Sequence, residues 1–131
     1  MIIKLKTGDK KYFEREVRTE DTAVFEAGAV HPVYATFALA RDAEWCGRLF
    51  VLEMKEDTEE GIGTFVEVNH ISPALIGNKV IFEATIESIR NHEIICSFVA
   101  RHEERVIARG RTGQKILRKE KLEKILEGLN A

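Results

Sequence analysis

The chain has 131 residues, of which 44% are hydrophobic and 32% are charged, and its formal net charge is -2 at pH 7. This length fits one domain over residues 1–131. The composition allows a buried core and excludes a disordered chain, which combines low hydrophobicity with high net charge. A charge this close to zero gives no reason to expect nucleic acid or an anionic membrane as a partner.

The two cysteines and the N-terminus indicate the compartment. Cys46 and Cys96 fall in apolar periodic segments without metal-site spacing, and one pair makes no disulfide framework, so we expect buried reduced thiols. The segment from Met1 to Lys6 is charged too early for a signal peptide. No stretch approaches the roughly 18 to 20 apolar residues of a membrane span. We therefore expect a cytoplasmic protein.

The first elements in chain order are predicted to be short. Residues 2–6 and about 11–18 are predicted as two strands around the turn-like segment 7–10. A helical turn is expected at Thr19-Glu20-Asp21-Thr22, because these residue types cap helices.

A long helix is predicted from Thr36 to about Met54. Small or apolar residues recur on one face at helical spacing: Ala35, Leu39, Ala43, Cys46 and Phe50. The opposite side is also apolar, with Phe37, Trp45, Val51 and Leu52. A helix that is apolar nearly all round is a buried helix.

After Gly61 the apolar period changes to two, which is typical of strands. Val66, Val68 and His70 share one strand face. Further strands are predicted at about 80–87, 94–101 and 104–117, with a tight hairpin at Asn91-His92 because Asn tolerates positive φ.

The last element is predicted as an amphipathic surface helix at about 118–129. Its apolar residues are expected to face inward: Leu122, Ile125, Leu126 and Leu129. The order is therefore strands, one long helix, four strands in meander-like succession and a surface helix. Since the long helix needs a sheet that curls around it, the sequence predicts an α+β fold with an antiparallel sheet wrapped around a long central helix.

Three segments carry a resemblance to a known family. They are Val33-Tyr34-Ala35-Thr36, then Glu44 eight residues after Thr36, then Gly63-Thr64-Phe65-Val66-Glu67-Val68-Asn69-His70, with Pro73, Gly77 and Val80 downstream. These segments resemble the hot-dog thioesterases, specifically the fluoroacetyl-CoA thioesterase-like family. The resemblance extends from about Glu14 to Leu117 and is most specific in the Thr-to-Glu spacing and the Gly-x6-His stretch.

The resemblance implies a catalytic set of Thr36, Glu44 and His70, with Gly63 where the backbone approaches the thioester. It implies hydrolysis of a short or modest acyl-CoA, with coenzyme A as part of the substrate and neither a cofactor nor a metal ion. It also implies a homodimer, with a tetramer left open, whose sheets join side by side and whose active sites lie at the subunit interface.

The acyl group is left open by the sequence. Tyr34, Phe37 and Phe65 are expected to line the pocket and to set its length. The family's namesake relies on an aromatic lid that has no clear counterpart here, and Phe37 follows Thr36 where relatives often have Pro or Gly. Fluoroacetyl specificity is therefore not predicted.

Each candidate residue also has a simpler structural interpretation. His70 suits proton transfer because its ordinary pKa lies near neutrality, but a lone histidine on an apolar face is often a core residue satisfied by hydrogen bonds. Glu44 has Arg41 three residues before it and Arg48 four after, which would suit a solvated ion-pair stripe or a subunit interface. Thr36 fits the N-cap of the long helix, where free N–H groups also suit an oxyanion.

Helix geometry separates two of these residues. Eight residues of one helix span about 12 Å, so Thr36 and Glu44 of one chain cannot share a hydrogen bond. Either Thr36 contacts the partner subunit's Glu44, or the two residues serve different ends of the site. Two other functions remain open: a non-catalytic module that binds acyl-thioesters, and a hot-dog hydratase or dehydratase, for which we find no matching motif.

Overall fold

The structure is a computed structural model that describes residues 1–25 and 28–130. In chain order the elements are β1 (Lys10–Glu16), the 3-10 turn η1 (Thr19–Asp21), β2 (Thr22–Phe25), β3 (Gly28–Tyr34), α1 (Thr36–Met54), β4 (Glu59–His70), β5 (Lys79–Arg90), β6 (Glu93–His102), β7 (Arg105–Arg118) and α2 (Lys119–Leu129). None of the described helices is long and apolar enough to cross a membrane.

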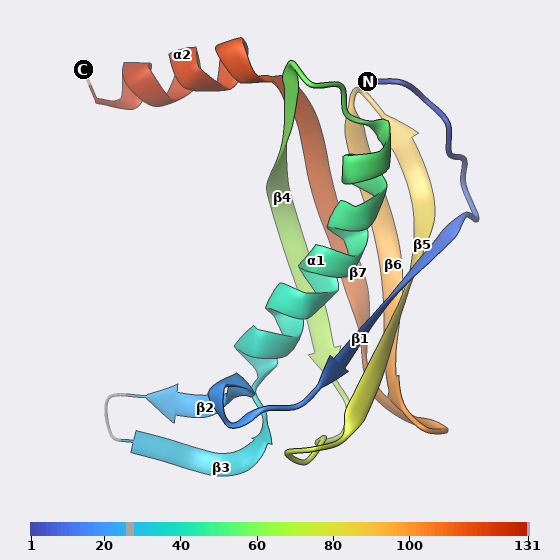
Figure 1. Ribbon diagram of the computed structural model, residues 1–131, viewed down its shortest axis with the longest axis vertical. Helices are drawn as coiled ribbons and strands as arrows, with labels where there is room; N and C mark the ends of the chain where they lie inside the picture. Colours follow the sequence, from blue (N-terminus) through green and yellow to red (C-terminus); the bar gives the residue numbers. More distant parts are fainter. Residues whose placement is uncertain (26–27, 131) are drawn as a thin grey trace.

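Five strands form one antiparallel sheet in the order β1-β5-β6-β7-β4, and β2 pairs with β3 in a separate hairpin. The sheet curves around α1, which contacts all five of its strands (Figure 1). The core lies between the helix and the concave face of the sheet, where α1 and the inner strand positions are both apolar. The α+β prediction of an antiparallel sheet wrapped around a long helix is confirmed.

The predicted succession of four strands is wrong in its first member. β5, β6 and β7 do follow one another as hairpins, but β4 pairs with β7 at the edge of the sheet and not with β5. The alternation of apolar residues tells which face of a strand is buried, but it carries no information about which strand is its neighbour. The hairpin turn is confirmed, with φ of 53° at Asn91 and 64° at His92.

The N-terminal prediction is correct only in part. The 3-10 turn η1 forms where the capping stretch was identified, and β1 begins at Lys10. Residues 2–6 form no strand. This segment is held instead by single contacts, such as the Ile2 N–H that donates to the Met54 carbonyl at 2.9 Å.

The long helix has the predicted bounds and one deeply buried face. Its predicted core residues, from Ala35 through Phe50, are each 4% exposed or less. The other side differs from the prediction of a helix buried nearly all round: Phe37 is 55% exposed, Trp45 41% and Leu52 43%. In a single chain, α1 therefore carries an uncovered apolar stripe opposite the sheet.

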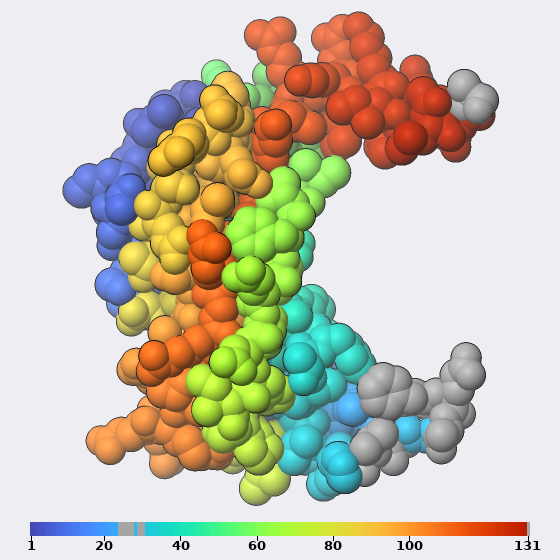
Figure 2. All heavy atoms as spheres, turned by 180° about the vertical axis from the view of Figure 1, so that it is seen from behind, coloured from blue at the N-terminus to red at the C-terminus, as the bar shows by residue number. Residues whose placement is uncertain are grey.

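The C-terminal helix does not pack inward as predicted. It leaves the end of β7 and projects away from the sheet (Figure 1), so that Ile125 is 46% exposed, Leu126 52% and Leu129 77%. At the other end of α1 the β2–β3 hairpin projects toward the same side, and the molecule is hollowed between these two arms (Figure 2). The apolar pattern of the helix is as predicted, but none of the described residues of the chain covers these three side chains.

Candidate active site

Thr36 and His70 meet where α1 begins and β4 ends. Thr36 is the first residue of α1, and His70 is the last residue of β4. The Thr36 hydroxyl oxygen lies 2.9 Å from His70 Nδ1, which is hydrogen-bond distance. The N-cap of α1 is Ala35, which makes no side-chain cap. Thr36 is therefore not the N-cap, and its hydroxyl forms a hydrogen bond with His70 instead of capping the helix.

The second ring nitrogen of His70, Nε2, is unusual because it is buried without a hydrogen-bond partner among the described residues. Burial lowers the pKa of His70 below its ordinary value of 6.5, and a backbone hydrogen bond at Ser72 opposes this only in part. His70 is therefore neutral at pH 7, with one nitrogen held by Thr36 and the other unpaired. A core histidine satisfied by hydrogen bonds would not leave that atom orphaned.

Glu44 lies against Gly63, on the same seam between α1 and β4. A Cβ at Gly63 would sit 2.9 Å from Glu44 Oε1, so the absence of a side chain at residue 63 makes room for the carboxylate. The seam thus brings together two pairs, Thr36 with His70 and Glu44 with Gly63. The hydrogen bonds of the described residues do not join one pair to the other.

The alternative interpretation of Glu44, an ion-pair stripe with Arg41 and Arg48, is not what the described residues form. Arg41 binds Asp21 at 2.9 Å and Asp42 at 3.1 Å, while Arg48 binds Glu60 at 3.2 Å. Within the described part of the chain Glu44 makes no ion pair. Because both arginines pair with other carboxylates, neither of them neutralises the Glu44 carboxylate.

A β-bulge explains how Gly63 and His70 both face α1. Residues seven apart on a regular strand point to opposite faces, because side chains alternate. The pairing of β4 with β7 shifts register between Gly63 and Phe65, which adds one residue to β4. Gly63 before the bulge and His70 after it therefore share the helix side of the sheet.

The three predicted pocket residues lie in different surroundings. Tyr34 is 1% exposed, and its hydroxyl donates to Asp42 in the core. Phe65 packs over Gly113 on the opposite face of the sheet from His70. Phe37 is exposed, directly after Thr36 in the first turn of α1.

Sequence reasoning missed Gln114, which is 3% exposed on β7. Its side-chain N–H donates to the carbonyl oxygen of Glu44 at 2.9 Å, and it is paired in register with Gly63. The sequence feature that could have indicated Gln114 is a polar residue at a position of β7 where the alternation of side chains predicts a buried one. Gln114 ties the middle of α1 to the sheet at the residue that carries the candidate carboxylate.

The family model of FlK, the fluoroacetyl-CoA-specific thioesterase, matches residues 17–120. A thioesterase superfamily member from Thermus thermophilus is 36% identical and superposes with a TM-score of 0.93, over 98% of this chain and 96% of that one.

More distant structures support the fold alone. A hot-dog-like protein from Thermanaerovibrio acidaminovorans is 18% identical, with a TM-score of 0.87 over 95% of this chain and 93% of that one. The fluoroacetyl-CoA thioesterase FlK is 19% identical, with a TM-score of 0.86 over 95% of this chain and 96% of that one. No protein of curated function matches the sequence. With four-fifths of its length covered by the family model, the chain belongs to the FlK thioesterase family, a family of thioester hydrolases with the hot-dog fold.

Proposed function

We propose that the protein hydrolyses a short or modest acyl-CoA to the free acid and coenzyme A. The observation that carries this proposal is the contact between Thr36 and His70, which leaves the buried Nε2 of a neutral imidazole unpaired among the described residues. An imidazole held at one nitrogen and free at the other suits a general base. Family membership supports the thioester as the bond that is broken.

The steps of the proposed reaction use groups along the α1–β4 seam. His70 Nε2 takes a proton from water as the water oxygen attacks the thioester carbonyl carbon. The carbonyl oxygen becomes negative, and the positive N-terminus of α1 favours this charge; Ala35 contributes no side-chain cap there. The C–S bond then breaks, and the thiolate of coenzyme A receives the proton from His70. In this scheme Thr36 holds the imidazole and orients the reacting group.

Glu44 and Gly63 complete the proposed site. Glu44 shares the handling of water and protons, and Gly63 allows the thioester to approach the backbone closely. Thr36 and Glu44 lie about 12 Å apart along α1. Therefore the Glu44 of one chain serves the other end of a site, or it serves the Thr36–His70 pair of the partner subunit. Phe37, exposed beside Thr36, is the proposed wall of the acyl pocket.

We propose that the active form is a homodimer, with a dimer of dimers as the alternative. The uncovered stripe of Phe37, Trp45 and Leu52 supports this, because large apolar patches on one chain mark interaction surfaces. β4 is an edge strand, so a second copy can join its sheet side by side with this one.

The proposed reaction needs no metal ion or separate cofactor, and coenzyme A enters only as part of the substrate. The described residues contain no group of metal-binding side chains. A cytoplasmic location is also proposed, which the two free buried cysteines support.

The test is release of free thiol from a panel of acyl-CoAs, from acetyl to long-chain and including polar and halogenated acyl groups. The proposal predicts turnover of the short or modest acyl group above the rate without enzyme. Binding of coenzyme A thioesters without thiol release from any member of the panel would contradict it and favour a non-catalytic binding module.

A further inference from the structure

A buried charged network lies next to Thr36, outside the proposed catalytic set. Its centre is Asp42, in the second turn of α1, which is 1% exposed. Arg15 on β1 donates two hydrogen bonds to the Asp42 carboxylate, both at 3.1 Å. A buried carboxylate without such partners would be strongly destabilising, so this network fixes its members relative to one another.

Tyr34 connects this network to the start of α1. Its hydroxyl donates to Asp42 Oδ2, and burial together with the nearby carboxylate raises the pKa of Tyr34 well above its ordinary value. The hydroxyl is therefore a permanent donor at any working pH. Tyr34 is the last residue of β3, and only Ala35 separates it from Thr36. The bond to Asp42 thus closes a short loop of chain that contains the N-cap of α1.

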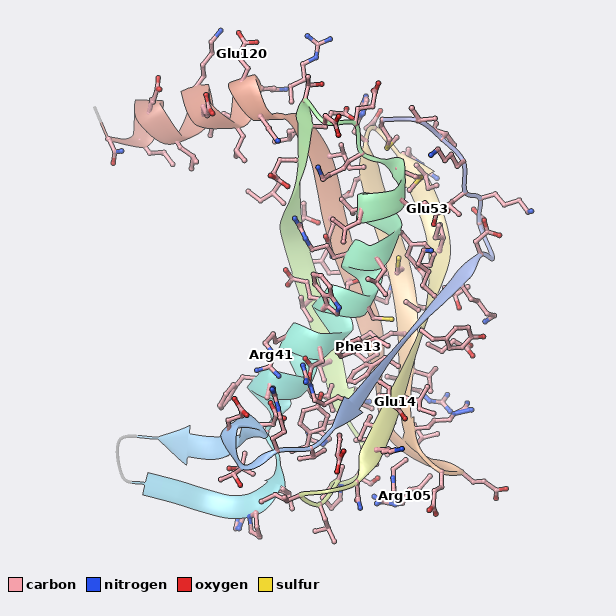
Figure 3. The ribbon with its side chains drawn as sticks, viewed as in Figure 1. Phe13, Glu14, Arg41, Glu53, Arg105 and Glu120 are labelled. Carbon is pink, nitrogen blue, oxygen red and sulfur yellow. The ribbon has the colours of Figure 1, made fainter. Side chains whose placement is uncertain are left out.

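A second branch holds the same loop from the other side. The Asp21 carbonyl of η1 accepts the Ala35 N–H at 2.8 Å. Arg41 bridges the two buried carboxylates, at 2.9 Å from Asp21 and 3.1 Å from Asp42. Figure 3 shows Arg41 beside the first turns of α1, next to the β2–β3 hairpin. Because the N-cap makes no side-chain cap, these bonds fix the helix start in place of one.

We propose that the Tyr34–Asp42 hydrogen bond is a positioning device that holds the Thr36 hydroxyl against His70. This inference rests on the proposed function and assigns Tyr34 to the alignment of the site instead of to the wall of the acyl pocket. Thr36 itself is exposed, so its position depends on the chain on either side of it. A misplacement of about 1 Å in a reacting group can lower a rate by about 10²-fold.

The test is Tyr34→Phe, which removes one hydroxyl, with Tyr12→Phe as the matched control on the exposed face of β1. We expect kcat for the preferred thioester to fall about tenfold in Tyr34→Phe, with KM nearly unchanged, because alignment is impaired while the pocket is kept. Tyr12→Phe should behave as wild type. In a Thr36→Ala background, Tyr34→Phe should cause no further loss, since the residue through which it acts is gone.

A second measurement reads the alignment without activity. The ring nitrogen NMR shifts of His70 should move in Tyr34→Phe toward those of Thr36→Ala, and Arg15→Lys, which weakens the hold on Asp42, should move them in the same direction. The inference would be overturned if folded Tyr34→Phe kept the wild-type ring nitrogen shifts of His70. It would also be overturned if the fold-loss in kcat of the double variant Tyr34→Phe/Thr36→Ala equalled the product of the two single losses. If wild-type protein releases no thiol, the proposed function fails, while these shifts still decide the positioning role.

Discussion

At the scale of single residues, the proposed chemistry depends on the protonation of His70. Burial makes the charged imidazolium less favourable, so the pKa of His70 lies below 6.5. A general base must be neutral to accept a proton, and the neutral form is populated above the pKa. The environment at the end of β4 therefore keeps His70 in the neutral form that the proposed base requires at neutral pH.

This gives a prediction for the pH dependence of the reaction. kcat/KM should rise with pH along a limb whose midpoint lies below 6.5, and should be flat from that limb through pH 7. The profile is measured by initial rates of thiol release at subsaturating thioester, with enzyme stability checked at each pH. A rate that falls as pH rises through this range would mean that His70 acts as a protonated acid in the limiting step.

The family resemblance named the members of the candidate site, Thr36, Glu44, Gly63 and His70. The structure places these four residues along one seam between α1 and β4. The network around Asp42 and the bond from Gln114 were not predicted, because they join residues far apart in sequence and follow no local spacing. Spacing also failed to show that Thr36 follows the N-cap, since the true N-cap, Ala35, is not a capping residue type.

At the scale of elements, the site depends on how closely α1 approaches β4. Apolar periodicity predicted the bounds of α1 and the shared face of Val66, Val68 and His70 on β4, because burial on one side imposes that period. It did not predict the edge position of β4 or the bulge after Gly63, which depend on pairing with β7. That bulge aligns Gly63 and His70 on one face, so an irregular feature creates the seam.

Gly63→Ala tests this seam. The new Cβ would lie 2.9 Å from Glu44 Oε1, and the carboxylate is the free end of a flexible side chain, so it would move away at little cost in stability. We expect kcat to fall about tenfold, as for displaced catalytic groups, with the melting temperature nearly unchanged. Gly128→Ala is the control, because a Cβ there meets no atom within 4 Å. Full activity in Gly63→Ala would remove Gly63 and the placement of Glu44 from the proposed mechanism.

At the scale of the whole molecule, one chain leaves apolar surfaces uncovered on both of its α-helices. They are the outer stripe of α1 and the apolar face of α2, which projects beyond the edge strand β4 (Figure 1). The sequence predicted both amphipathic patterns, and it placed the α2 residues inward because a sequence does not show whether the covering surface belongs to the same chain. In the proposed dimer, a second copy joined along β4 covers the stripe of α1.

The proposed dimer is tested with Trp45→Glu, at the centre of the exposed stripe. Burying an unpaired carboxylate in an apolar interface is costly, so the variant should sediment as a single chain while wild type sediments at twice that mass. Ile81→Glu is the matched control, because Ile81 is 48% exposed on the outer face of the sheet. If wild type sediments as a tetramer and Ile81→Glu sediments as a dimer, the assembly is a dimer of dimers. Wild type that sediments as a single, active chain would contradict the dimer.

The central claim is that His70 is the base for thioester hydrolysis, and the most direct measurement compares thiol release by wild type, His70→Ala and His102→Ala. His102 is the control because its Nδ1 contacts the Lys79 carbonyl oxygen, at the end of β6. The account predicts a fall in kcat of about 10²–10⁴-fold in His70→Ala, the range for a general base, and wild-type rates in His102→Ala. Equal turnover by His70→Ala and wild type, with the variant folded, would contradict it.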